Sequence, residues 1–561
     1  MPKSLFDWLI FLLAAVVYLA GLQLTVMDVD SAQYAAISRE MAESGEYLQV
    51  FNRGKDYLDK PPLLFWAASL SFEVFGVYNW SFKLIPFVFA LFSLFAVYRL
   101  GKLLFDARTG KLGAILLGSS QAYFLFTNDL RTDTLLTACV VLATWQIMEF
   151  LQGDGKRLRV VWGFAFIGLA MLAKGPLGLV VPGLALASHI LINRQWRNLF
   201  RWEWLLGLLV TASVLAPMSW GLYQQFDLQP DKVVMMPSPE GMQPRSGISG
   251  LRFFFWEQSF GRITGENVWK DGSGPFFFVH TFLWSFMPWA LLAVVALFWK
   301  LISEVQHTWR KGNGEWLLLG GFIIPFLVLS TSQFKLPHYI FPLYPFAALF
   351  TAQWLIVWSK SSAAPWKRIS LYALAALTLL ATAVLLAAIG YWIFHQKNPA
   401  KWIALCTFLL SFIPLFRMPT KKAIWRTLAL GSIGFNLLMN LHFYPLLLHY
   451  QKGSAVAELA QDEGATWKSS AYLGDFSYSF DFYMGGAVPV RSQPDQILPH
   501  ERYIFTDQDG LNMLKSSKKS IAKEVVVPTY PITNLSGDFL DPNRRQQVLR
   551  ATYLVILEPE A

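Results

Sequence analysis

Two carboxylates follow directly on the first long apolar run of the chain. The run covers Leu5–Met27, and Asp28 and Asp30 come immediately after it. A carboxylate at the end of an apolar span is only partly hydrated, a setting in which it can act as a base or hold a metal ion. The segment Tyr34–Met41 then has apolar residues at helical spacing, which predicts a helix lying along the membrane surface. An explanation of equal weight is therefore that Asp30 or Ser31 is simply the N-cap of this helix, which would stabilise the helix by ~1 kcal/mol.

Lysines close to prolines precede three further apolar runs. They are Lys60 in Tyr57-Leu58-Asp59-Lys60-Pro61-Pro62, Lys174 in Lys174-Gly175-Pro176, and Lys335 in Lys335-Leu336-Pro337. Proline favours the first turn of a helix, and the free N–H groups and positive dipole end of such a turn attract a phosphate. A single lysine of this kind is more simply explained by its ammonium group reaching the membrane surface. Three on one face indicate a binding region for an anionic lipid head group.

Further charged residues lie in two connections that we place on the same face. In the first, Asn128–Asp133, the side chains of Asp129, Arg131 and Asp133 have the alternative structural role of pairing with one another. In the second, the aromatic run Phe253–Trp256 is typical of an interfacial anchor. It would hold the guanidinium of Arg262 near the head groups, where a bidentate contact with phosphate is natural.

The composition places these residues in a membrane protein. Of 561 residues, 54% are hydrophobic and only 15% charged. The net charge of +10 is scattered between apolar runs and forms no stripe, which argues against nucleic-acid binding. Cys139 and Cys406 lie within apolar runs and are expected to be packing residues. The eight histidines show no metal-ligand spacing, so His338, beside Lys335, is more simply a hydrogen-bond partner. No glycine loop of a nucleotide site is present.

The elements that must position these residues are predicted from hydropathy and charge. About thirteen apolar segments suit spanning helices of roughly 20 residues, including Lys111–Thr127 and Phe276–Trp299. Lys and Arg collect in alternate short connections, which we therefore place in the cytoplasm. The predicted fold is an all-α polytopic membrane domain over residues 1–448, with loops 28–62 and 224–275 at its outer face. Turn signals and short β-like runs predict a soluble mixed α/β domain, also outside, over residues 449–561.

Together these motifs resemble the GT-C class of membrane glycosyltransferases that use polyprenyl-phosphate sugars. The resemblance is greatest to the 4-amino-4-deoxy-L-arabinose (lipid A) transferase family, which is related to the protein O-mannosyltransferases. Four motifs carry the resemblance: Asp30 with Tyr34–Met41, Tyr57–Pro62, Glu257 with Arg262, and Lys335–Tyr339. It implies a thirteen-span protein of the bacterial inner membrane, with its active site and a soluble domain in the periplasm and an undecaprenyl-phosphate sugar as donor.

The resemblance also implies roles for individual residues. Asp30 would be the catalytic carboxylate, and Lys60, Arg262 and Lys335 would bind the donor phosphate. We expect the pocket to include Tyr34, Tyr57, Asp59, Arg131, Asp133, Lys174, His338 and Tyr339. Asp59 stands where relatives more often carry Glu, and Asn128–Asp133 fits the protein-mannosylating branch equally well. The acceptor is therefore left open between lipid A, a protein and a polysaccharide.

The implied chemistry is an inverting displacement. Breaking the bond between sugar and phosphate leaves a phosphate that gains negative charge, and fixed cations stabilise that state most. Asp30 would act as general base toward a hydroxyl acceptor. Toward a phosphate acceptor, whose second pKa is about 6, it would instead position the acceptor or stabilise oxocarbenium character. We expect no obligatory metal, although Asp28 and Asp30 leave a divalent cation open.

Two other classes of function remain open at the level of sequence. In a lipid-linked sugar transporter, the charges would be gate residues. Ionisable residues that gather at one face, without a visible half-repeat, favour the enzyme over this class. A non-catalytic envelope-assembly protein would use its soluble domain for contacts.

Overall fold

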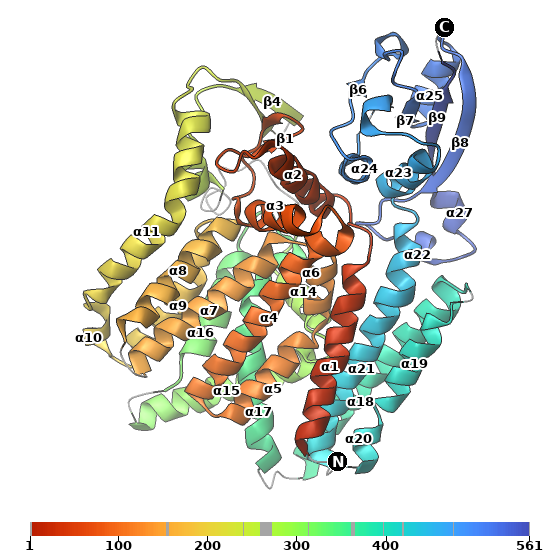
Figure 1. The fold of residues 1–561 in the computed structure, drawn as a ribbon. Helices are drawn as coiled ribbons and strands as arrows, with labels where there is room; N and C mark the ends of the chain where they lie inside the picture. The colour runs from red at the N-terminus through yellow and green to blue at the C-terminus, as the bar shows by residue number, and fades with distance from the viewer. Residues whose placement is uncertain are drawn as a thin grey trace.

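The computed structural model describes residues 3–152, 156–238, 241–258, 272–311, 314–360, 365–396, 398–417, 420–474 and 476–559. They form a long helical bundle with a smaller α/β unit at one end, and the C-terminus lies in that unit (Figure 1). The N-terminus lies at the opposite end of the bundle. We call the end that carries α2 (Asp30–Ser44), α3 (Leu63–Phe75) and the α/β unit the loop end. Within the described residues, seven helices are long and apolar enough to cross a membrane, and the chain is a multi-span membrane protein.

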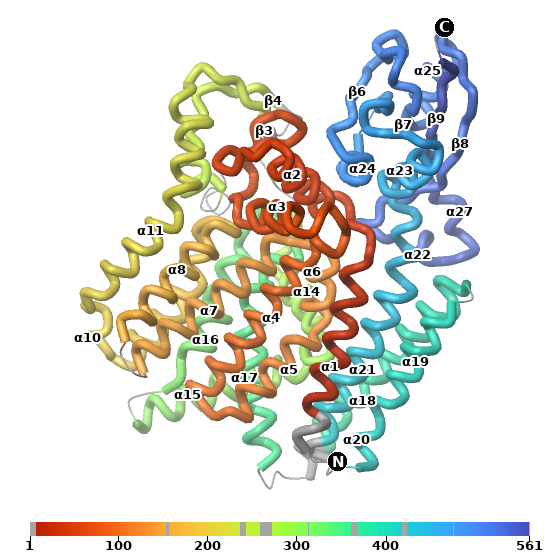
Figure 2. The backbone as a smooth tube through the Cα atoms, viewed as in Figure 1, coloured from red at the N-terminus to blue at the C-terminus, as the bar shows by residue number. Residues whose placement is uncertain are grey.

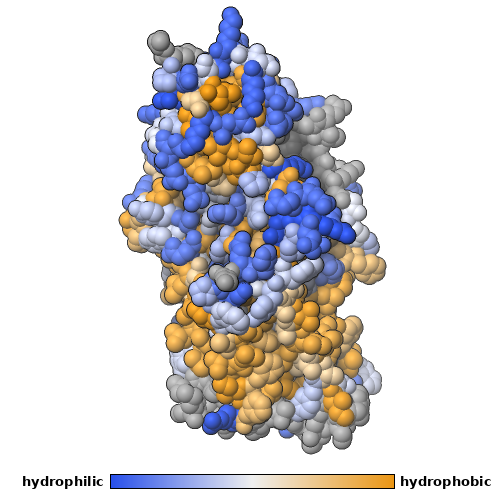
Figure 3. All heavy atoms as spheres, turned by 90° about the vertical axis from the view of Figure 1, so that its right-hand side faces the viewer, coloured by the Kyte–Doolittle hydropathy of each residue, from blue (hydrophilic) through white to orange (hydrophobic). Residues whose placement is uncertain are grey.

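The bundle is built from apolar helices that run between its two ends. They are α1 (Lys3–Leu22), α4 (Asn79–Leu104), α5 (Ala107–Gly118), α6 (Gln121–Asn128), α7 (Thr132–Gln152), α8 (Arg157–Lys174), α9 (Leu177–Ile192), α11 (Glu203–Leu222), α14 (Phe277–Ser285), α15 (Ala290–Lys311), α16 (Leu317–Ser330), α17 (Tyr344–Lys360), α18 (Pro365–Ala387), α19 (Ala400–Leu410), α20 (Ile413–Arg417), α21 (Thr420–Leu438) and α22 (Tyr444–Leu448), with the short α10 (Trp196–Leu199). On the face drawn in Figure 3, hydrophobic residues dominate the surface of the bundle and hydrophilic ones gather toward the loop end.

Helix α7 lies at the centre of the bundle. In its most apolar stretch 89% of the residues are buried. The corresponding share is 28% for the segment Trp196–Asp227, which faces outward. It packs against α4, α8 and α9. Because α7 starts at Thr132, its first turn brings Asp133 into the packed interior at the loop end.

Two apolar segments that we predicted as single spans are each broken in the structure. Lys111–Thr127 divides into α5 and α6 at Ser119-Ser120, where both hydroxyls donate to preceding carbonyls, those of Ile115 and Leu117, in competition with the helical pattern. Phe276–Trp299 divides into α14 and α15, because Pro288 has no N–H to donate. The breaks meet in space. The amide of Gln121 donates to the carbonyl of Met287 at 2.9 Å, and the Trp289 indole donates to Ser119 Oγ at 3.2 Å.

A thin layer of short elements covers the loop end. Helix α2 buries Tyr34, Ile37 and Met41, the apolar face that the sequence predicts, and α3 begins directly after Pro61-Pro62. Two antiparallel hairpins lie beside them: β1 (Phe51–Asn52) with β2 (Lys55–Asp56), and β3 (Val234–Ser238) with β4 (Gly241–Arg245). The short α12 (Gly250–Arg252) completes the layer.

The chain after Leu448 forms the α/β unit, which we call the distal domain (Figure 2). Its sheet has the order β6-β5-β7-β9-β8, in which β6, β5 and β7 are parallel to one another. Strand β9 is antiparallel to both of its neighbours, β7 and β8, so β8 runs in the same direction as β7. The strands are β5 (Ser470–Leu473), β6 (Val490–Arg491), β7 (Tyr503–Thr506), β8 (Ile521–Thr529) and β9 (Arg550–Leu557). The helices are α23 (Lys452–Asp462), α24 (Tyr478–Met484), α25 (Gln508–Lys515), α26 (Gly537–Leu540) and α27 (Arg545–Val548). Separate apolar clusters form around Tyr472 and around Leu473, which point to opposite faces of β5.

Candidate active site

The carboxylate of Asp30 forms an ion pair with Arg131 at the loop end. Asp30 is the first residue of α2 and Val29 precedes it, without any side-chain cap, so the N-cap explanation for Asp30 or Ser31 is wrong. Instead Oδ2 of Asp30 pairs with Nη1 of Arg131. The same guanidinium bonds to Oδ2 of Asp129 through Nε at 3.0 Å and Nη2 at 2.8 Å. Arg131 therefore orients Asp30, whose side chain is 40% exposed and can be reached by a ligand.

A second ion pair lies next to the first. Lys174 ends α8, and its Nζ is 2.5 Å from Oδ1 of buried Asp133 and 4.3 Å from the ring centroid of Tyr339. Nε2 of His338 is 3.8 Å from the other oxygen of Asp133. The expectation that Asp129, Arg131 and Asp133 pair with one another is therefore wrong for Asp133, because α8 delivers a lysine to it.

Two buried tyrosines, Tyr34 and Tyr57, lie near these charges. Burial raises the pKa of Tyr34 well above its ordinary value, as do the charges of Asp30, Asp59 and Asp133 around it. The pKa of Tyr57 is likewise raised, first by burial and then by Asp59. Both phenols therefore remain neutral hydrogen-bond donors at neutral pH. Their shared surroundings also show that Asp30, Arg131, Asp59 and Asp133 belong to one electrostatic neighbourhood around Tyr34.

Three buried polar atoms in this neighbourhood have no hydrogen-bond partner within the described part of the chain. They are the Tyr57 hydroxyl, Ser31 Oγ and Asp129 Oδ1. Buried polar groups are almost always satisfied, so each such atom calls for an occupant. Burial also raises the pKa of Asp129, against the lowering effect of Arg131. The site thus offers a donor hydroxyl, a second hydroxyl and a carboxylate oxygen to a polar ligand.

Lys60 and Lys335 lie at the same end of the bundle. Nζ of Lys60 is 2.7 Å from Oδ2 of Asp59, and the Gln258 side chain donates to the backbone carbonyl of Asp59. Nζ of Lys335 donates to the carbonyl of Ser273 at 3.0 Å. Arg262, predicted to share the donor phosphate with them, lies outside the described residues. Glu257, its partner in the motif, forms an exposed ion pair with Arg252 at 3.1 Å.

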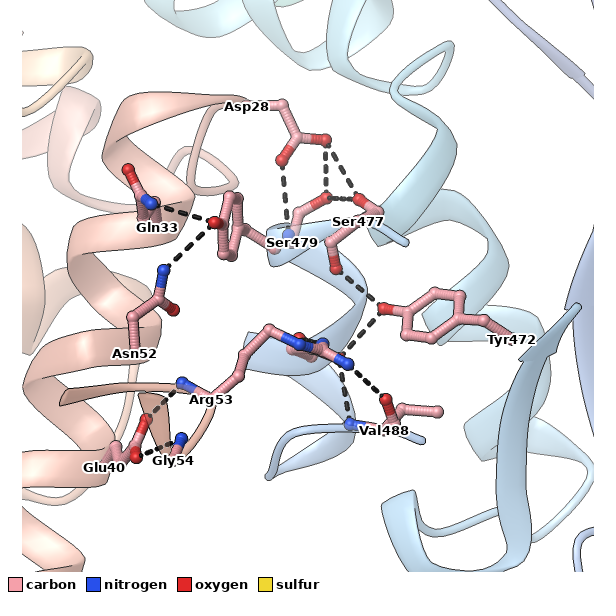
Figure 4. Close-up of polar contacts among 12 residues, drawn as sticks. Asp28, Gln33, Glu40, Asn52, Arg53, Gly54, Tyr472, Ser477, Ser479 and Val488 are labelled. Carbon is pink, nitrogen blue, oxygen red and sulfur yellow. Dashed lines mark hydrogen bonds and ion pairs between the residues drawn. The ribbon is translucent and has the colours of Figure 1, made fainter. Parts of the chain in front are cut away.

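Asp28 does not share a site with Asp30. Its Oδ2 accepts hydrogen bonds from the hydroxyls of Ser479 at 2.7 Å and Ser477 at 3.4 Å, and its Oδ1 accepts from the Ser479 amide at 3.2 Å (Figure 4). Burial raises the pKa of Asp28, against the lowering effect of these bonds. In this structure the two carboxylates serve different networks, and a divalent cation held by Asp28 and Asp30 together stays a prediction. No cluster of three potential metal-binding side chains occurs in the part of the chain that the structure describes.

Sequence reasoning missed the residues that support this site. Lys83, near the start of the apolar run Asn79–Arg99, is fully buried, and its Nζ donates to the carbonyl of Leu24 at 2.7 Å, which fixes the exit of α1. A charge within an apolar run is a usable signal for such a role. Arg53 bonds to the distal domain, and only the turn residues Arg53-Gly54 mark it in the sequence.

Comparisons with known proteins show what this chain is similar to. The family model described as dolichyl-phosphate-mannose-protein mannosyltransferase matches residues 59–220, which contain Lys60, Arg131, Asp133 and Lys174. The undecaprenyl phosphate-alpha-4-amino-4-deoxy-L-arabinose arabinosyl transferase of Edwardsiella ictaluri is 25% identical over 57% of this chain and 54% of its own length. The protein of the same name from Pseudomonas aeruginosa is 28% identical over the same shares. The chain thus matches about half the length of these curated relatives.

A structural comparison covers nearly the whole chain. The crystal structure of ArnT from Cupriavidus metallidurans bound to undecaprenyl phosphate superposes with a TM-score of 0.73 and 18% identity, over 99% of this chain and 98% of that one. The two proteins therefore share a fold that includes the distal domain. The resemblance to the GT-C glycosyltransferases and to the aminoarabinose transferase family that the sequence motifs indicated is confirmed.

Proposed function

We propose that this chain is an inverting glycosyltransferase of a bacterial inner membrane, moving a sugar from undecaprenyl phosphate to a cell-envelope acceptor. The observation that carries the proposal is the arrangement around Tyr34, where a carboxylate, cations and unsatisfied buried donors meet at one end of a membrane bundle. The fold shared with a protein crystallised with undecaprenyl phosphate supports this donor. In the proposal the bundle has thirteen spans, and the loop end and distal domain face the periplasm.

The proposed sugar is 4-amino-4-deoxy-L-arabinose, and the proposed acceptor is lipid A. The support is the printed name of the curated relatives, which specifies that sugar on undecaprenyl phosphate, together with the sequence motifs. The family model for protein mannosyltransferases, matched over residues 59–220, makes a protein hydroxyl the second candidate acceptor.

The proposed reaction is a single displacement at the anomeric carbon. The acceptor oxygen forms the new bond, the bond to the phosphate oxygen breaks, and the phosphate leaves with the electron pair. Lys60, Arg262 and Lys335 stabilise the charge that develops on the phosphate, and each well-placed group of this kind contributes about 10²–10³ in rate. The protonated phenols of Tyr34 and Tyr57 add neutral donors.

Asp30 faces the acceptor side of this reaction. Toward a hydroxyl acceptor it takes up the proton as the new bond forms. Toward a phosphate of lipid A, already ionised at neutral pH, it orients the acceptor or balances positive charge on the sugar. In either case the pair with Arg131 fixes the direction of its carboxylate.

Purified protein with undecaprenyl-phosphate aminoarabinose and lipid A tests the proposal. Asp30→Asn and Lys60→Ala are each expected to lower turnover at least a hundredfold. Glu43→Gln is the matched control, because Glu43 is an exposed carboxylate of the same helix and, within the described residues, its ion pair is the local one with Arg39 at 2.7 Å. Turnover at the level of the unmodified protein in both Asp30→Asn and Lys60→Ala would contradict the catalytic assignment. Mass spectrometry of lipid A and of envelope proteins from cells lacking the protein separates the two acceptors.

A further inference from the structure

The turn of the β1–β2 hairpin places a non-glycine residue in a left-handed conformation. Phe51 pairs with Asp56 and Asn52 with Lys55, which leaves Arg53 and Gly54 as a two-residue turn with φ of +57° and +70°. Turns of this type require positive φ at both positions, which glycine adopts freely and arginine adopts at a cost. Contacts of Arg53 with the rest of the molecule must therefore offset that cost.

Those contacts come from two sides of the turn. On one side, the carboxylate of Glu40 in α2 accepts hydrogen bonds from the amides of Arg53 and Gly54, each at 2.8 Å (Figure 4). On the other side, the Arg53 guanidinium enters the distal domain. Its Nη1 pairs with Oδ2 of Asp481, and its Nη2 donates to the carbonyl of Val488 at 2.6 Å. The hairpin is thus held between α2 and the distal domain.

Asp481 is built to receive this guanidinium. Its second oxygen, Oδ1, accepts from the Tyr472 hydroxyl at 2.9 Å and from the Val488 amide at 3.0 Å, so the carboxylate is fixed before Arg53 arrives. The side chain of Asp481 is 3% exposed and that of Arg53 17%. The guanidinium also lies 4.7 Å from the ring centroid of Phe476. Removing either partner of this buried ion pair would leave the other as an uncompensated charge, which is strongly unfavourable. The pair therefore holds the hairpin and the distal domain in one relative position.

Helix α24, which carries Asp481, also contacts the same loop at other points. The Tyr478 hydroxyl accepts from the side-chain amides of Gln33 in α2 at 2.9 Å and Asn52 in β1 at 3.0 Å. Ser479 bonds to Asp28, two residues before Asp30. Helix α24 therefore contacts the segment 28–62 at three places: just before α2, on α2, and at the β1–β2 hairpin. The same segment carries Lys60 near its end.

We propose that Arg53 is a positioning residue of the transfer site: by joining the β1–β2 hairpin to Asp481 it makes the distal domain hold the loop that carries Asp30 and Lys60. The inference rests on the proposed function and assigns the distal domain a part in it. Arg53 does not touch the substrates. It sets where the carboxylate and the cation of one continuous segment stand relative to the bundle, and small displacements of catalytic groups are costly to the rate.

Hydrogen exchange of the full-length protein in nanodiscs tests the mechanical part. In Arg53→Met, amides of residues 30–44 and 51–60 are expected to exchange at least tenfold faster, while those of β8 and β9 keep their rates. Arg491→Met is the matched control, because Arg491 forms an equivalent pair with buried Glu501 inside the distal domain and, among the described residues, has no ion pair with residues 28–62. Unchanged exchange in residues 30–60 of Arg53→Met would overturn the proposal.

Turnover of the same variants tests the positioning part. Arg53→Met is expected to lower kcat at least tenfold, and Arg53→Lys, which keeps the charge opposite Asp481, is expected to restore most of both exchange protection and kcat. Asp481→Asn breaks the pair from the other side and serves if Arg53→Met does not fold. A loosened loop with unchanged kcat would overturn the inference. Full turnover in both Asp30→Asn and Lys60→Ala would instead overturn the proposed function, whereas the exchange result tests only the attachment of the loop.

Discussion

Removing the Arg131 side chain should leave two carboxylates without their shared cation. The Arg131 and Asp129 side chains are 15% and 16% exposed, so this pair is largely shielded from water. Breaking such a pair from one side costs about 3–5 kcal/mol of unfolding free energy, because the remaining charge stays buried. We therefore predict that Arg131→Met destabilises the protein by about this amount and lowers turnover through the loss of the contact that orients Asp30.

A double variant separates the two effects. In Arg131→Met with Asp129→Asn the uncompensated buried charge is gone, so at least half of the lost stability should return. Turnover should stay low, because Asp30 still lacks its guanidinium partner. Unfolding free energies in mixed micelles and kcat measure the two quantities. Arg252→Met is the control: its pair with Glu257 is 70% and 42% exposed, and such pairs are worth about 0–1 kcal/mol. If the double variant proved as unstable as Arg131→Met, the reasoning about the buried charge would be refuted.

Three further predictions concern the scaffold. Burial raises the pKa of Asp481 to about 6 against 3.8 in an exposed group, so the folded distal domain binds the proton more tightly than the unfolded chain. Its unfolding free energy relative to Asp481→Asn should therefore fall by about 2 kcal/mol as pH rises from 4 to 7.5. Equal pH slopes in the hydrogen-exchange stabilities of β5 would contradict this prediction. Ser479→Ala removes the hydroxyl donor from buried Asp28 and should cost about 1–3 kcal/mol, whereas Ser516→Ala, at an exposed distal site, should be nearly neutral in the same denaturation assay. Gly110→Ala would place a Cβ 2.3 Å from the carbonyl oxygen of Tyr98, so α4 and α5 must separate. Thermal unfolding should therefore begin at a lower temperature. An unchanged melting curve would contradict this prediction.

Local patterns predicted the elements of the site well. The apolar spacing of Tyr34, Ile37 and Met41 marks the buried face of α2, and Pro61-Pro62 marks the start of α3. These features depend on residues at most three or four positions apart, so they can be predicted from the local sequence. The N-cap explanation for Asp30 was wrong because its carboxylate pairs with Arg131 instead. Arg131 is about a hundred positions away in the sequence, so local spacing could not indicate this partner.

Long-range partners and interrupted helices were not visible in the sequence. Asp28 and Ser479 are 451 residues apart, and no local spacing relates them. The breaks at Ser119-Ser120 and Pro288 fall inside strongly apolar runs, so a hydropathy window passes over them, although the two breaks bond to each other. The β1–β2 hairpin is too short for a periodic pattern. Its role depends on the distal domain, which the sequence placed outside without indicating its contact surface.

The most direct test of the account is a cryo-EM structure of the protein with bound undecaprenyl-phosphate sugar. The account predicts the phosphate beside Lys60 and Tyr57, with Asp30 reaching the acceptor side of the anomeric carbon either directly or through one water. A phosphate bound at the opposite end of the bundle, or an Asp30 carboxylate separated from the sugar by packed protein, would contradict it.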